Sequence, residues 1–221
     1  MSQTLQSEHA VVPFWKRLLF SQVLADQSAA KRIAYMGVVA ALCIATNMFE
    51  IKFATVQFSL TVFSSVIAGM IIGPLFGFAA VFLGDAVGYL YNSMGYPYYW
   101  WVALSCAVMA LISGLVMNGI KTKTKGGVYL KLALVCVLTF LVCSVVINST
   151  GMYYIGLKLY MPSNVKNAIE NTFGGRFSFG IYLVIRFFLL GQIYNSLVNY
   201  ALVFAVVPAL LAIKPLKIRL D

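Results

Sequence analysis

Charged residues are scarce in this chain, and their scarcity decides its class. Of 221 residues only 10% are charged and 62% are hydrophobic, and the mean hydropathy is +0.90. Soluble domains carry about 25% charged and roughly 45–50% apolar residues. A soluble fold of this length would leave much apolar surface in water, so the sequence predicts an integral membrane protein. The formal charge of +10 is explained by Lys and Arg retained at the cytoplasmic side of spans, and no nucleic-acid partner is expected.

Catalytic and metal-binding residues are lacking as well. Histidine occurs once, at His9, in the polar start of the chain. Cys43, Cys106, Cys136 and Cys143 lie in apolar runs without a C-x-x-C pair, so we expect neither a disulfide frame nor a metal site. The sequence contains no G-x-x-x-x-G-K-[ST] phosphate loop, no H-E-x-x-H and no catalytic Ser/His/Asp set. We therefore expect a protein that is not an enzyme and has no intrinsic cofactor.

Apolar segments are abundant and predict six crossings. A helix of about 20 residues spans roughly 30 Å of hydrocarbon, and the first three segments are slightly short, which suits helices packed inside a bundle. The expected fold class is an all-α membrane bundle of six transmembrane helices. The predicted spans are 33–47, 58–73, 75–92, 99–119, 129–148 and 182–213.

Lysine and arginine predict the orientation, because cytoplasmic loops retain them. With both termini inside, eleven of the 16 fall on the inner side and five on the outer side. Residues 1–30 are expected to be a cytoplasmic tail in which Pro13–Leu24 forms an amphipathic helix on the membrane surface, or else a plain tail. Residues 31–221 are expected to form the transmembrane substrate-binding domain. The inner set is Lys16, Arg17, Lys31, Arg32, Lys121, Lys123, Lys125, Lys131, Lys214, Lys217 and Arg219, and the outer set is Lys52, Lys158, Lys166, Arg176 and Arg186.

Aromatic residues crowd the outer end of the fourth predicted span, where the run Gly95–Trp101 begins it. Five of them lie within six residues, and another stands just upstream. Aromatic belts anchor helices at the membrane interface, but stacking faces with hydroxyl and indole donors also suit a flat conjugated ligand. We interpret these residues as substrate-binding, with a belt as the alternative, and add Tyr153 from the long third outer connection, residues 149–181. The crowded set is Tyr91, Tyr96, Tyr98, Tyr99, Trp100 and Trp101.

One carboxylate lies in the middle of a span. Asp85 sits in the third span, where a charge costs about 2.5–3.5 kcal/mol on insertion scales. Arg186, near the outer end of the sixth span, is its expected partner in a structural ion pair and is also a candidate for binding substrate. A proton or ion site at Asp85 is the alternative.

Amide side chains form a second polar group. Gln192, Asn195 and Asn199 share one face of the sixth span, where they either bond neighbouring helices or line a polar pocket. Asn47 and Asn148 end outer helices and reach toward the same region. Gln192, Asn47 and Asn148 are therefore included among the candidate substrate-binding residues.

Small residues recur every four positions in the first span, at Gly37, Ala41 and Ala45. Such spacing lets two helices approach closely where lipid supplies no hydrophobic drive. Packing within the bundle is the simplest explanation of this strip.

Three motifs together make the chain resemble the substrate-binding (S) components of energy-coupling factor (ECF) importers, the prokaryotic ABC-type vitamin transporters. They are Lys31-Arg32 followed by Ala41-x-x-x-Ala45, the I-A-G-M-I-I-G-P-L-F-G-F turn (residues 67–78) and F-L-G-D-A-V-G (residues 82–88). The resemblance implies a six-helix fold in the plasma membrane with substrate bound near the outer face. It also implies a transmembrane coupling subunit and two ATPase subunits that use ATP, with Gly37, Ala41 and Ala45 contacting the coupling subunit.

The general look of the chain is that of the folate, pantothenate and cobalamin branch of these importers. A Phe-Pro-Gly-like segment typical of folate members is replaced here by Tyr96 to Trp101. The broad aromatic rim and long third outer connection favour a large vitamin, and cobalamin is the predicted ligand, with folate or pantothenate as alternatives. The competing function is a self-sufficient secondary transporter driven by protons through Asp85.

Overall fold

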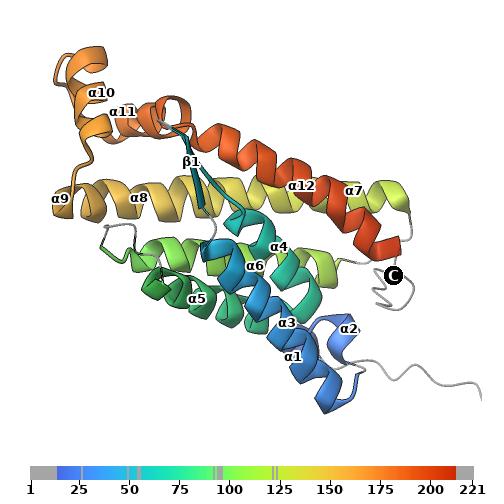
Figure 1. Ribbon diagram of the computed structural model, residues 1–221. Helices are drawn as coiled ribbons and strands as arrows, with labels where there is room; N and C mark the ends of the chain where they lie inside the picture. The colour runs from blue at the N-terminus through green and yellow to red at the C-terminus, as the bar shows by residue number, and fades with distance from the viewer. Residues whose placement is uncertain are drawn as a thin grey trace, which may run out of the picture.

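The computed structural model describes residues 14–25, 27–48, 50–53, 56–91, 93, 97–120, 122 and 124–212, and these form a bundle of apolar helices with one β-hairpin (Figure 1). Segments η1 to η3 are π-helical and continue neighbouring α-helices. The elements are α1 (Phe14–Leu19), α2 (Gln22–Ala25), α3 (Ala29–Met48), β1 (Glu50–Phe53), β2 (Val56–Ser59), α4 (Thr61–Ile72), α5 (Pro74–Tyr91), α6 (Trp100–Gly119), α7 (Lys125–Leu138), η1 (Thr139–Asn148), α8 (Ser149–Gly151), η2 (Met152–Gly156), α9 (Leu157–Leu159), α10 (Ser163–Phe173), α11 (Phe179–Val184), η3 (Ile185–Leu189) and α12 (Gln192–Ala212).

The bundle has two distinct ends. In Figure 1 the start of α6 and helices α8 to α11 lie at the left, and we call this the α11 end. At the right lie α2, the start of α7 and the end of α12, which we call the α2 end. The strands β1 and β2 pair antiparallel, with Glu50 opposite Ser59 and Phe53 opposite Val56.

Helix α4 is the centre of the bundle. It packs against α3, α5, α6 and α12, and nine of its twelve residues are buried. At about 1.5 Å per residue it is roughly 18 Å long, which is too short to cross the hydrocarbon core. A helix surrounded by other helices has little contact with lipid, so its length need not match the membrane.

Glycines bring α4, α5 and α6 unusually close together. A Cβ on Gly77 would lie 2.8 Å from the Gly69 Cα, and one on Gly114 would lie 2.7 Å from the Pro74 Cα. At this contact the Ser113 hydroxyl donates to the Val66 carbonyl oxygen at 2.8 Å. Small residues and interhelical hydrogen bonds are the main sources of helix association where the surroundings are as apolar as the side chains.

The predicted all-α membrane bundle is confirmed, whereas the count of six is not reproduced by helix length. Among the described residues five helices are long and apolar enough to cross a membrane. The second predicted span is the exception, because residues 58 and 59 belong to β2 and the remainder is the short α4. The five long helices are Ala29–Met48, Pro74–Tyr91, Trp100–Gly119, Gly126–Leu159 and Gln192–Ala212.

The third outer connection differs from its prediction as a glycine-rich loop. The helix from Gly126 runs unbroken to Leu159, because Gly151 and Gly156 make room for a packed side chain and do not break the helix.

The sixth predicted span, 182–213, is interrupted. Gly191 has φ +73°, a left-handed conformation that ends a helix, so α11–η3 and α12 are separate.

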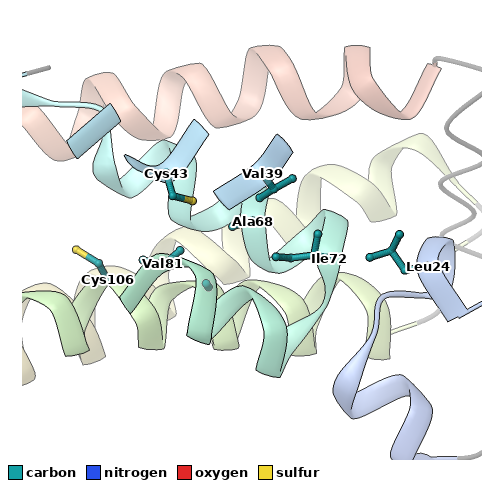
Figure 2. Close-up of a cluster of buried hydrophobic side chains, with 8 residues drawn as sticks. Leu24, Val39, Cys43, Ala68, Ile72, Val81 and Cys106 are labelled. Atoms are coloured by element: carbon teal, nitrogen blue, oxygen red, sulfur yellow. The ribbon is translucent and has the colours of Figure 1, made fainter. Parts of the chain in front are cut away.

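The segment before α3 is docked on the turn between α4 and α5. The Ser21 amide donates to the Ile72 carbonyl oxygen at 3.2 Å, and Arg32 donates to the Leu24 and Ala25 carbonyl oxygens at 2.8 and 2.7 Å. Figure 2 shows Leu24 pointing toward Ile72 at the edge of a buried cluster. The predicted single helix Pro13–Leu24 is two short helices in the described part of the chain, and Pro13 lies outside it.

Gly73→Ala is expected to destabilise the fold. Gly73 has φ +108°, and strained backbone of this kind costs about 1–3 kcal/mol in other residues. Its Cβ would also lie 2.5 Å from the Phe20 carbonyl carbon. Thermal unfolding of the detergent-solubilised protein measures the effect. Gly180→Ala is the matched control, since its Cβ would meet nothing within 4 Å, and equal unfolding temperatures for the two variants would contradict the expectation.

Candidate functional site

The aromatic run predicted from sequence forms a cluster at the start of α6. Tyr89 and Tyr98 have ring centroids 4.9 Å apart, and Tyr99 stacks on Trp101 at 5.1 Å. Trp100 meets Trp101 edge-on at 5.8 Å but is half exposed. Tyr91 is 73% exposed and fits the belt interpretation better, and Tyr96 lies outside the described residues.

A second aromatic cluster surrounds Tyr153 at the same end of the bundle. Its ring lies 5.2 Å from Phe177, 5.3 Å from Phe179 and 5.8 Å from Tyr182. The Tyr182 hydroxyl accepts a hydrogen bond from Arg186 Nη1 at 3.1 Å, so the cluster contacts the only arginine predicted to bind substrate. Sequence reasoning missed Phe177, Phe179 and Tyr182, although three aromatic residues within six positions after the Gly174-Gly175 pair could have signalled them.

Trp101 lies between α6 and the long helix that carries Tyr153. A Cβ on Gly151 would be 2.5 Å from Trp101 Cγ and 2.9 Å from Nε1, and one on Gly156 would be 3.2 Å from Cζ2. The indole therefore rests directly on the backbone of that helix. Beside it the Ser105 hydroxyl donates to the Cys143 carbonyl oxygen at 3.0 Å, which joins α6 to η1.

Four buried side-chain polar atoms in the described part of the chain have no hydrogen-bond partner, and all four belong to predicted substrate-binding residues. They are the Tyr98 hydroxyl, Trp101 Nε1, Asn148 Oδ1 and Arg186 Nε. Buried polar groups are nearly always paired, and an unpaired one calls for an explanation. Two of the four are obligate donors, one is an acceptor, and the tyrosine hydroxyl can act as either. Donors and acceptors are therefore both present among the unpaired atoms.

The Asp85 carboxylate lies near Tyr98. Burial first, and the charge of Asp85 second, raise the pKa of the Tyr98 hydroxyl to about 12, so Tyr98 stays protonated at physiological pH. The contact with the Asp85 carboxylate falls short of ordinary hydrogen-bond geometry, but this interaction contributes to the same rise in pKa, so Asp85 is a partner within reach of the hydroxyl.

The predicted ion pair between Asp85 and Arg186 does not form among the residues that the structure describes. Arg186 is 9% exposed and donates to Tyr182 instead. The two residues belong to different parts of the bundle: α5, with Asp85, packs on α3, α4 and α6, whereas η3, with Arg186, packs on α10, α11 and α12. Similar depth in the membrane did not bring them together.

The amide face of α12 holds the bundle together. Asn199 Oδ1 accepts from the Phe63 amide at 3.0 Å and thereby caps α4, and its Nδ2 donates to the Ser59 carbonyl oxygen at 2.8 Å. Asn195 Oδ1 accepts from the Ser59 amide at 3.2 Å. These bonds support the alternative in which the amides join neighbouring elements. Gln192, one turn earlier, is half-buried.

Asn47 is likewise engaged within the fold. Its Nδ2 donates to the Cys43 carbonyl oxygen at 3.0 Å, and its Oδ1 accepts from the Thr61 hydroxyl at 3.2 Å. A Cβ on Gly88 would lie 2.7 Å from the Asn47 Cβ, so α3 and α5 are in close contact here. Of the amides predicted to bind substrate, only Asn148 has a buried oxygen without a partner.

The small-residue strip of α3 faces away from the bundle. The buried residues of α3 are Val39, Cys43 and Thr46, which lie on the opposite side of the helix from Gly37 and Ala41. Those two are exposed and Ala45 is half-buried, and a Cβ on Gly37 would meet nothing within 4 Å. The strip therefore does not serve packing between helices of this chain.

Asn199→Ala should lower stability more than any surface asparagine change. It would leave the Phe63 amide and the Ser59 carbonyl without this partner, at about 1–3 kcal/mol for each buried group. Thermal unfolding in detergent measures the difference from Asn171→Ala, an exposed asparagine on α10. If the two variants unfold at the same temperature, the amide face is not what fixes α12 to α4.

Comparison with known proteins places the chain in a family. The model of the ECF-type riboflavin transporter S component matches residues 27–196. Among solved structures, that of "FolT bound with folic acid" is similar, with a TM-score of 0.56 and 18% sequence identity over 80% of this chain and 93% of that one. This likeness concerns the fold alone, and no curated protein sequence matches the chain. From the family match, the chain belongs to the S components of the ECF-type riboflavin transporter family, which are multi-pass membrane proteins.

Proposed function

We propose that this chain captures a vitamin with a flat heteroaromatic ring, of the flavin or pterin kind, and delivers it as the S component of an ECF importer. The observation that carries the proposal is the coincidence of the four unpaired buried polar atoms with predicted ligand residues. Tyr98 and Trp101 belong to the aromatic cluster at the start of α6, and Arg186 bonds Tyr182 of the second aromatic cluster. Aromatic faces and a few fixed polar groups are the usual composition of a small-molecule site.

The choice of ligand class rests on hydrogen-bonding character and on size. Trp101 Nε1 and Arg186 Nε require acceptors, and Asn148 Oδ1 requires a donor, which a ring with carbonyl oxygens and an N–H supplies. The sequence favours cobalamin because of a broad aromatic rim and a long third outer connection. Residues 149–159 and 163–173 of that loop are helical, and α10 buries Val165 and Ile169 against Tyr182 and Ile185. These packed helices weaken the argument for a very large ligand. The match to the riboflavin transporter family supports a flavin.

In this proposal the α11 end faces outward. The α2 end would then lie inside, as the bias of Lys and Arg favours. The docked α2 segment and the turn at Gly73 would face the cytoplasm, and the aromatic clusters would meet a ligand arriving from outside.

Energy would come from a transmembrane coupling subunit and two ATPase subunits. The chain has no phosphate loop of its own, and we propose that it is not an enzyme. The exposed strip of Gly37 and Ala41 on α3, continued by Ala45, is the proposed contact with the coupling subunit. Exposed apolar neighbours, Ile33 and Val38, extend this surface.

The ligand itself is the first test. Mass spectrometry of the purified protein should find riboflavin or a folate retained, and equilibrium binding should rank these above pantothenate and cobalamin. Arg186→Gln should weaken binding by about 10–100-fold, because a charge-assisted hydrogen bond is lost. Arg176→Gln, an exposed arginine, is the matched control. Retention of cobalamin alone would overturn the flat-ring proposal, and binding of no vitamin would overturn the function.

Replacement of a strip residue should separate transport from binding. Ala41→Trp is expected to abolish uptake in cells that also express the coupling subunit and ATPases, while the purified variant binds vitamin normally. A bulky side chain prevents the close helix contact that small residues permit. Ala201→Leu, at an exposed alanine of α12, should change neither property. Equal loss of binding and uptake in Ala41→Trp would argue that the strip is part of the fold.

The competing function, a proton-driven secondary transporter, predicts a different outcome. Purified chain alone in proteoliposomes would accumulate vitamin in response to a pH gradient, and Asp85→Asn would abolish it. Under our proposal the chain alone does not accumulate vitamin, and a tagged chain co-purifies with a membrane partner and ATPases.

A further inference from the structure

We infer that Trp101 and Asn148 form one recognition element that reads a ring carbonyl and its adjacent N–H, and that Gly151 is the residue that positions it. This inference rests on the proposed function and specifies which atoms of the ligand are read. It begins from the chemistry of the two unpaired atoms: Trp101 Nε1 is a donor without an acceptor, and Asn148 Oδ1 is an acceptor without a donor.

The indole is held by its five-membered ring. A Cβ on Gly151 would meet Cδ1 first, then Cγ at 2.5 Å and Nε1 at 2.9 Å, and one on Gly156 would lie 3.2 Å from Cζ2. Trp101 is only 4% exposed, and the Tyr99 and Trp100 rings contact it as well. Because Gly151 lacks a side chain, the five-membered ring of the indole can approach the backbone of the long helix. Any larger residue would displace it.

Asn148 lies one helical turn before Gly151 on the same helix, so its side chain is on nearly the same face. It is the last residue of the π-helical segment η1, and π-helical turns are often found at functional sites. The neighbouring Ser149 is already paired, because its Oγ donates to the Ser144 carbonyl oxygen at 2.8 Å. The Asn148 oxygen is a buried acceptor without a partner, one helical turn before the glycine on which Trp101 packs.

Packing alone does not explain this pair. A tryptophan used only to fill space could be a phenylalanine, which brings no donor to be buried, and a buried unpaired donor costs about 1–3 kcal/mol. The same applies to the Asn148 oxygen. A ring lactam or imide, with a carbonyl beside an N–H, satisfies both atoms at once. Riboflavin and folate each carry this unit, whereas the corrin ring of cobalamin does not.

The test uses riboflavin and folate, and the same two molecules methylated at the ring N–H next to the carbonyl. Wild-type protein in nanodiscs should bind the parent vitamin about tenfold more tightly than its methylated form, the loss expected for one hydrogen bond. Asn148→Ala should bind the two forms alike. Trp101→Phe keeps a packed ring and should lose about tenfold in affinity for the parent, whereas Trp15→Phe should be unchanged.

Gly151→Ala is tested by spectroscopy as well as affinity. The chain has three tryptophans, so ¹⁵N-labelled indoles give three N–H signals, and Trp101→Phe identifies one. In wild type this signal should shift on vitamin binding. In Gly151→Ala it should start at another position and shift less, with selectivity against the methylated form reduced. Gly180→Ala is the control.

The outcomes separate this inference from the proposed function. If the parent vitamin binds wild type and Trp101→Phe equally well, or if Asn148→Ala keeps the wild-type selectivity, the inference is wrong and the function stands. If wild type binds only cobalamin or pantothenate, the flat-ring proposal and this inference both fail. Absence of binding to any vitamin overturns the function together with the inference.

Discussion

The close approach of α4, α5 and α6 is the constraint on which the rest of the structure depends. Apolar burial contributes little to association between helices in lipid, so contact distance and interhelical hydrogen bonds decide which helices pack. Gly69, Gly77 and Gly114 remove the side chains that would keep the three backbones apart. The short α4 is then enclosed, and its carbonyl groups at Val66 and Met70 accept from Ser113 and Asn118 of α6.

The two ends of α4 show how this centre organises the molecule. At its start the Phe63 amide donates to Asn199, which fixes α12 to α4. At its end the Ser21 amide donates to the Ile72 carbonyl oxygen, next to the turn at Gly73. The polar groups along these contacts are mostly paired within the chain. The buried polar atoms left without partners lie toward the α11 end, away from the glycine contact. The polar side chains that join the helices are therefore a different group from those proposed to meet the ligand.

The sequence predicted the fold class and pointed to much of the candidate site because both follow from local composition. Apolar length located α3, α5, α6 and α12, and the density of aromatic residues before α6 located Tyr98 and Trp101. What failed depended on contacts between distant residues. In the sequence Gly151 and Gly156 indicate a loop, but Trp101 packs on both of them and the helix continues. Asp85 and Arg186 are predicted to pair from their similar depth, but α5 and η3 pack on different helices. The break at Gly191 needs a φ value that no periodicity reports.

The same contacts explain why some predicted site residues are engaged in the fold and others are not. Asn47 is fully used between Cys43 and Thr61, at a point where Gly88 brings α5 against α3. Asn148 has similar chemistry, but its oxygen has no partner, and the helix that carries it packs through Gly151 against the indole of Trp101. Leaving a buried polar atom unpaired costs free energy, so such an atom calls for an explanation, and in the function proposed above a bound ligand supplies it. Under that proposal, the paired amides build the fold and the unpaired amide meets the ligand.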